Sequence, residues 1–100
     1  MANAPIDRTL GEAVRACRFD VRLSLREVAR RAKLSAAFVG DIELGRRKAK
    51  PDTVRRIARA LGANEDYLLD AGVKSKVRAL VKKLEPLGYE VRLQRRPSNR

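Results

Sequence analysis

The sequence contains no histidine and a single cysteine, Cys17, among its 100 residues. Without histidine there is no imidazole general base, no Ser-His-Asp triad and no histidine metal ligand. One cysteine forms neither an intrachain disulfide nor a zinc cluster, so we expect no metal and no cofactor. Cys17 is interpreted as a small core residue, and so low a cysteine count suits a reducing cytoplasm, the location we expect.

Long apolar runs and aromatic side chains are also scarce. No stretch approaches the roughly 20 apolar residues of a membrane-spanning helix, so we expect no membrane partner. Aromatic residues make up 4% of the chain and hydrophobic residues 44%, enough for one small aliphatic core. The chain has no recognisable nucleophile–base pair and no phosphate-binding loop, and the sequence therefore indicates a protein that is not an enzyme.

Basic residues outnumber acidic ones by two to one. Lys and Arg total 24 and Asp and Glu total 12, which gives a net charge of +12. Residues 1–72 hold 15 basic and 10 acidic side chains, whereas residues 73–100 hold 9 and 2. An excess this large in so short a chain predicts a polyanionic partner, with nucleic acid favoured over a membrane surface.

Residues 1–72 are predicted to form a compact all-α domain of five short helices. Apolar residues recur there at helical spacing in five segments joined by short connections. The expected capping residues are Thr9, Ser24, Ser35, Asp52 and Asn64. Gly45, Gly62 and Gly72 are expected to end the third, fourth and fifth helices.

Residues 73–94 are predicted to form an amphipathic helix that ends at Glu85, before Pro86, and one strand over residues 89–94. A lone strand must find a partner for its backbone, and an identical strand of a second subunit is the simplest one. We therefore expect a homodimer and a flexible basic tail over residues 95–100. The predicted dimer contacts are Val77, Leu80, Val81, Leu84, Tyr89, Val91 and Leu93.

Two short helices joined by a tight turn are the segment expected to carry function. The helices Leu25–Ala32 and Ala36–Leu44 are joined by Lys33-Leu34-Ser35. Ala29 is small enough for the point where the helices cross, and Leu34 fills the space behind the turn. This spacing is typical of a helix-turn-helix, which presents the N-terminal end of its second helix to the DNA major groove.

Residues 10–72 resemble the Cro/CI-type helix-turn-helix proteins, also called the XRE family. The matching segments are Ser24–Ala29, Leu34-Ser35, Val39–Arg47, Ile57–Gly62 and Asp66–Leu69. The resemblance implies a five-helix, lambda-repressor-like domain that binds double-stranded DNA in a sequence-specific manner as a dimer. It also implies a transcriptional regulator, usually a repressor.

The resemblance assigns roles to individual positions. Leu25 and Arg26 match positions that touch phosphate or an outer base, and Arg18 and Glu43 match a pair that braces the fold. The positions that match the groove-facing side of the recognition helix are Ser35, Ala36, Ala37, Gly40 and Asp41. The cations expected to follow the DNA backbone after that helix are Arg46, Arg47, Lys48 and Lys50.

The sequence departs from the family pattern in two ways. Lys33 stands where relatives often have glycine, and a left-handed backbone would cost this residue about 1 kcal/mol, so we expect a slightly different turn. Ala36, Ala37 and Gly40 are too small for bidentate bonds to bases. Base readout is thus expected to use few contacts together with DNA shape. Asp41 is suited either to accept from a cytosine amino group or to cap an arginine.

Two alternatives to a repressor stay open on the sequence alone. An antitoxin would bind DNA through the same domain and would cover a toxin with the helix and strand of residues 73–94. A non-specific scaffold or RNA-binding module would use the positive charge alone. We expect no small-molecule effector, because little chain remains to build its pocket.

Overall fold

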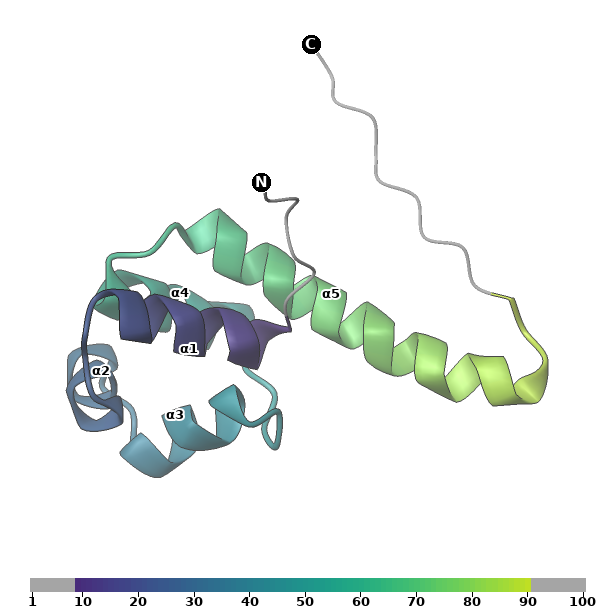
Figure 1. Ribbon diagram of the computed structural model, residues 1–100, viewed down its shortest axis with the longest axis horizontal. Coiled ribbons are helices and arrows are strands. Elements are labelled where there is room, and N and C mark those ends of the chain that lie inside the picture. Colours follow the sequence, from purple (N-terminus) through teal and green to yellow (C-terminus); the bar gives the residue numbers. More distant parts are fainter. Residues whose placement is uncertain (1–8, 91–100) are drawn as a thin grey trace, which may run out of the picture.

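The computed structural model describes residues 9–90, and within that range the chain forms five α-helices and one 3-10 turn (Figure 1). The elements are α1 (Leu10–Asp20), α2 (Leu25–Ala32), α3 (Ala36–Glu43), α4 (Pro51–Leu61), α5 (Glu65–Leu84) and η1 (Glu85–Leu87). The predicted all-α fold of five helices is confirmed for this part of the chain. The bounds of α2 are those predicted, and α3 is one residue shorter than predicted.

Side-chain caps begin four of the five helices. Thr9 and Glu12 form a reciprocal capping box at α1, with the Thr9 N–H donating to Glu12 Oε1 at 2.9 Å. Ser24, Ser35 and Asn64 each accept from the backbone N–H three residues later. The predicted cap at Asp52 is wrong, because α4 begins two residues earlier than that cap implies. The fixed φ of Pro51 suits the first helical position, and Lys50 is the N-cap residue.

Gly72 does not end a helix. The predicted fifth helix and the predicted amphipathic helix are one continuous 20-residue helix, α5, with Gly72 inside it. A helical glycine costs only about 1 kcal/mol relative to alanine, which the turns on both sides of Gly72 outweigh. The helix ends instead at Leu84, where Pro86 lies in the 3-10 turn and Gly88 closes it with φ +92°. The division into domains at residue 72 stays a prediction.

The predicted C-terminal strand is not found in the part of the chain that the structure describes. Tyr89 and Glu90, its first two residues, are in no strand, and residues 91–94 lie outside the described range. Residues 9–90 contain no strand at all, so there is no sheet edge with which these two residues could pair.

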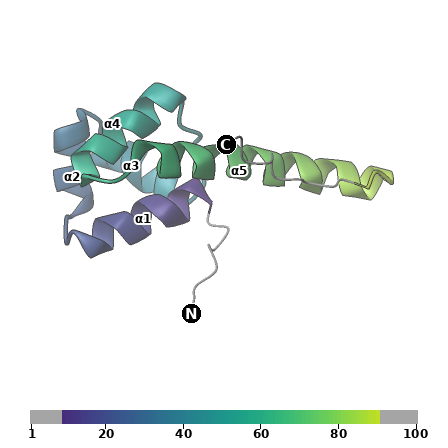
Figure 2. The ribbon, with the colours of Figure 1, turned by 90° about the horizontal axis from the view of Figure 1, so that it is seen from above.

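A single aliphatic core joins all five helices. Its completely buried large side chains are Val14, Val28, Val39, Ile42, Ile57 and Leu68. The first half of α5 packs on α1 and α4, whereas beyond Ala71 no residue of α5 is buried. The second half of α5 therefore extends away from the other helices (Figures 1 and 2). No helix in residues 9–90 is long and apolar enough to cross a membrane.

Candidate nucleic-acid interface

Helices α2 and α3 pack against each other through small and branched side chains. Val28 and Ala29 of α2 and Val39 and Ile42 of α3 are all buried in the common core. Leu34, in the turn between the helices, packs against this core and is half-buried. The two helices are consequently fixed to the body of the domain, and the opposite side of α3 faces solvent.

The turn between α2 and α3 keeps the left-handed conformation although its residue is a lysine. Lys33 has φ 59° and ψ 47°. The prediction that the lysine changes the conformation of this turn is therefore wrong. The Leu34 N–H donates to the Ala29 carbonyl at 2.8 Å, which closes the end of α2. Arg56 of α4 supports the same end: its Nε donates to the Ala32 carbonyl at 3.0 Å and its Nη2 to the Lys33 carbonyl at 2.8 Å.

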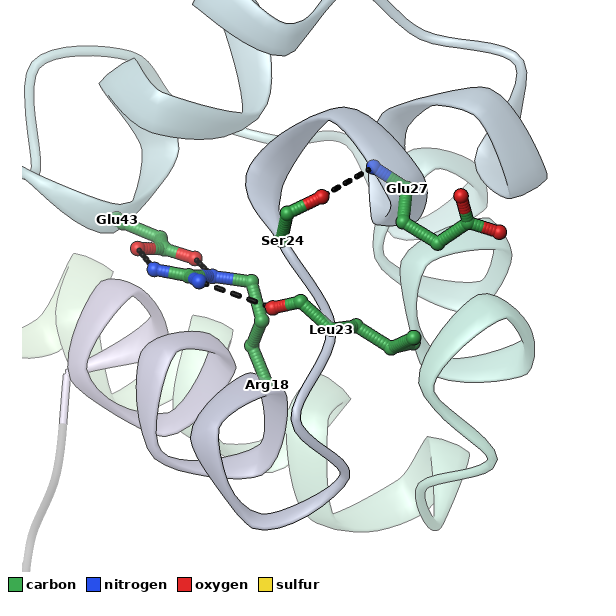
Figure 3. A network of polar contacts seen from close by, with 5 residues as sticks. All are labelled: Arg18, Leu23, Ser24, Glu27 and Glu43. Atoms are coloured by element: carbon green, nitrogen blue, oxygen red, sulfur yellow. Dashed lines mark hydrogen bonds and ion pairs between the residues drawn. The ribbon is translucent and has the colours of Figure 1, made fainter.

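Arg18 and Glu43 form a two-point ion pair that joins α1 to the end of α3 (Figure 3). Arg18 Nε lies 2.7 Å from Glu43 Oε2, and Arg18 Nη2 lies 3.1 Å from Glu43 Oε1. Arg18 Nη1 also donates to the Leu23 carbonyl at 3.1 Å. The two side chains are only 12% and 6% exposed. The bonds to Glu43 raise the pKa of Arg18 further above its ordinary value.

Gly11 is a point of close approach between α1 and the end of α3. A Cβ atom at this position would lie 2.5 Å from the Ile42 carbonyl oxygen and in still closer contact with that of Glu43. Nearby, the Leu10 N–H donates to Ser75 Oγ at 2.8 Å, and that hydroxyl donates to the Ala71 carbonyl at 3.0 Å. These contacts fix the start of α1 against both α3 and α5.

The outer side of α3 carries small side chains at the positions assigned to the major groove. Ser35 and Ala37 are exposed, and Ala36, Gly40 and Asp41 are half-buried. The Ser35 hydroxyl accepts from the Phe38 N–H at 3.0 Å. A Cβ atom added to Gly40 would meet only Leu25 Cδ1, at an ordinary contact distance of 3.7 Å. Packing within the chain therefore does not require glycine at this position.

Four cations follow α3 on the connection to α4. The connection reverses at Gly45, whose φ is +75°, and is anchored by the buried Ala49. The cations on it, all exposed, are Arg46, Arg47, Lys48 and Lys50. The Arg47 guanidinium lies 5.4 Å from the centre of the Phe38 ring. The structure thus brings these cations together beside the C-terminal end of α3.

The first turn of α2 lies beside the outer side of α3, where Leu25 is next to Gly40. Leu25 is half-buried and Arg26, in the same turn, is exposed. Glu27 in the same turn pairs with Arg30 and, at 3.1 Å, with Arg31 Nε. Hydrogen bonds from these arginines lower the pKa of Glu27 below its ordinary value. Part of the acidic charge beside the surface is therefore neutralised by arginines of the same helix.

The predicted dimer contacts on α5 share its protruding half. Val77, Val81 and Leu84 are half-buried, Leu80 is 54% exposed, and Tyr89, beyond the helix, is 62% exposed. Val91 and Leu93 lie outside the described residues.

The part of the chain in residues 9–90 has no group of three His, Cys, Asp or Glu side chains that could hold a metal ion.

Sequence reasoning did not find Arg56, Gly11 or Ser75 as residues that position the interface. Each acts through a contact with a distant segment, such as the 65 residues that separate Leu10 from Ser75. One arginine, glycine or serine within a helical pattern gives no local signal of such a contact.

Comparisons with known proteins agree with this geometry. The model of a family described as a helix-turn-helix domain matches residues 9–71. A comparison with curated proteins finds no match. The crystal structure of the clp gene regulator ClgR from Corynebacterium glutamicum is 30% identical, with a TM-score of 0.59 over 72% of this chain and 95% of that one.

Two further solved structures share the fold. PA4674 from Pseudomonas aeruginosa, solved in complex with its operator DNA, is 21% identical, with a TM-score of 0.69 over 85% of this chain and 92% of that one. An addiction module antidote protein of a HigA family from Coxiella burnetii is 22% identical, with a TM-score of 0.65 over 85% and 91%. The protein therefore belongs to the helix-turn-helix domain family of DNA-binding regulators.

Proposed function

We propose that the protein is a sequence-specific, homodimeric repressor that places α3 of each subunit in the major groove of a partly palindromic operator. The observation that carries the proposal is the outer side of α3. Ala36, Ala37 and Gly40 leave this side without long side chains, and packing inside the protein does not require glycine at position 40. A surface of small residues allows close approach to base edges, where alanine methyl groups contact thymine methyl groups.

The charges around α3 support the same proposal. Arg26 lies at the start of α2, and four cations follow α3, while Asp41 is the acid among the residues assigned to DNA. Cations on two sides of a helix suit the two phosphate ridges that border a major groove. The phosphates would fix the register of the protein, and the few groups on α3 would select the sequence.

The protruding half of α5 supports the homodimer. Val73, Val77, Leu80 and Leu84 follow one another on α5 at alternating spacings of four and three, which is the spacing of a helix–helix seam, and Leu87 follows in the 3-10 turn. Val73, Leu80 and Leu87 are 59%, 54% and 73% exposed. A second copy that packs on this stripe would remove an exposed apolar surface from water. Two subunits would then contact half-sites about one helical turn, roughly 34 Å, apart.

Selection of bound duplexes from a random pool tests this function. A sequence-specific dimer enriches an inverted repeat whose halves are about 10–10.5 base pairs apart, and footprinting of the selected duplex protects both halves. Repression follows where the operator overlaps a promoter, because the bound protein then blocks polymerase. A pool that shows no enriched motif would instead favour the non-specific scaffold and overturn the proposal.

An antitoxin is the second candidate, because an exposed apolar stripe on α5 can cover a different protein as well as a second copy. Sedimentation of the purified chain separates the two candidates. A stable dimer without any other protein supports the repressor. A monomer that becomes a defined complex only with the product of a neighbouring gene supports the antitoxin.

A further inference from the structure

A groove lies between the N-terminal end of α1, the connection that follows α3, and one side of α5. Its volume is about 520 Å³. Five cations line it: Arg47 and Lys48 from the connection, and Lys76, Arg78 and Lys82 from α5. The groove thus brings Arg47 and Lys48, which are proposed to contact the DNA backbone, next to cations of α5, the helix proposed to form the dimer.

The acids that line the groove are fewer than its cations. Glu43 is held in the two-point pair with Arg18, and Glu12 accepts from the Thr9 N–H in the capping box. These are the two acidic residues among the lining residues, against five cations. Such a surface attracts an anion, and charges spread over two elements suit a row of phosphates better than one small anion.

The cations that line the groove and the apolar stripe are centred on different sides of α5 and meet at Lys76. Lys76, Ala79 and Lys82 recur at spacings of three and line the groove. On a helix with 3.6 residues per turn, Lys82 lies on the side away from Val77, Leu80 and Leu84, whereas Lys76, four residues before Leu80, lies at the edge of the apolar stripe. A second subunit on the apolar stripe would therefore border the groove at Lys76 and leave Lys82 on the side away from it, accessible to a further partner.

We infer that the groove is a second phosphate-contacting site, in which Lys76 and Lys82 of α5 hold the DNA backbone beyond the phosphates reached by the connection after α3. The occupant is duplex DNA, because Arg47 and Lys48 border both surfaces and so make them continuous. This inference rests on the proposed DNA-binding function and extends the footprint of each subunit toward α5.

The test compares two double variants that remove the same charge. K76Q/K82Q removes two exposed cations from the groove. R59Q/K74Q removes two cations outside it, which pair with Glu65 and Asp70 at 3.1 and 3.2 Å. Binding of a mixed-sequence duplex and of the selected duplex is measured over a range of salt concentrations. Urea unfolding and sedimentation confirm that both variants keep the fold and the oligomeric state of the unchanged protein.

For K76Q/K82Q we expect the magnitude of the salt slope, log K against log salt, to fall by about 1.8 on either duplex, since each lost phosphate contact accounts for about 0.9. We expect R59Q/K74Q to change the slope by much less. Ethylation of some phosphates should also weaken binding of the unchanged protein but leave binding of K76Q/K82Q unaffected.

Equal slopes for the two variants, with unchanged ethylation patterns, overturn the second site while leaving the proposed regulator intact. A fall in slope without any enriched operator keeps the site and refutes sequence-specific regulation instead. Failure of the unchanged protein to bind either duplex overturns both.

Discussion

Arg56 Nη2 of α4 lies 2.8 Å from the carbonyl oxygen of Lys33, the left-handed residue in the turn of the helix-turn-helix. Arg56 Nε also donates to the Ala32 carbonyl, so one guanidinium occupies two free acceptors at the end of α2. A cation at the C-terminal end of a helix is also favoured by the helix dipole. These two hydrogen bonds stabilise the end of α2 and so help to offset the cost of a left-handed lysine at this position.

Arg56→Met should lower the free energy of unfolding by about 1–2 kcal/mol, because it removes both hydrogen bonds and keeps most of the apolar stem. Lys33→Gly should raise it by about 1 kcal/mol, because glycine adopts the left-handed conformation without strain. Urea unfolding measures both, with Arg55→Met on the same helix as the control. An Arg56→Met protein as stable as the control would show that the turn does not depend on Arg56.

Gly11→Ala should destabilise the protein by about 1–3 kcal/mol, because the new methyl group would overlap the Ile42 and Glu43 carbonyl groups and push α3 away from α1. Gly72→Ala is the matched substitution, since nothing lies within 4 Å of its Cβ position inside α5. It should stabilise the protein by up to about 1 kcal/mol. Thermal unfolding in which both variants gain stability would refute the close α1–α3 contact.

The sequence was sufficient to predict the helix pair, because its signals are local. Ser24 and Ser35 each cap a helix, and the buried positions Val28, Ala29, Val39 and Ile42 recur at helical spacing. The same reasoning failed at Gly72, since a glycine ends a helix only where the chain also turns, and there the chain continues as α5. It failed at Asp52 because Pro51 fits the first helical position better.

The positioning contacts could not be predicted from local signals. Arg56 reaches a turn 23 residues earlier in the chain, and Gly11 meets carbonyl groups of α3. The groove is likewise built from α1, the connection after α3, and α5. Each of these features depends on how the helices pack, which a pattern within one helix does not report.

Leu80→Asp should convert the proposed homodimer into monomers, because a carboxylate in the middle of the apolar stripe would be buried without a partner. Leu80 is 54% exposed in the single chain, so the fold of each subunit should persist. Sedimentation velocity measures the change, and binding to the selected duplex should weaken with it. Val21→Asp, at another exposed apolar residue, is the control and should stay dimeric. A dimeric Leu80→Asp protein would move the interface elsewhere.

Arg46→Ala should weaken binding to every duplex by a similar factor, because a phosphate contact carries no sequence information. The magnitude of the salt slope should fall by about 0.9 for the one lost contact. Titrations at several salt concentrations measure this, with Arg59→Ala as the control that removes the same charge from the end of α4. An unchanged slope for Arg46→Ala would remove this residue from the interface.

Gly40→Ala tests most directly whether the outer side of α3 contacts DNA. The methyl group has room within the protein, so the free energy of unfolding should rise by up to about 1 kcal/mol. Against the base edges the same methyl group would be too large, and affinity for the selected duplex should fall about tenfold or more while affinity for unselected duplexes is kept. The decisive measurement is the ratio of the affinity for the selected duplex to that for unselected duplexes, in Gly40→Ala and in the unchanged protein. We expect a lower ratio for the variant, and an equal ratio would contradict contact between the outer side of α3 and DNA.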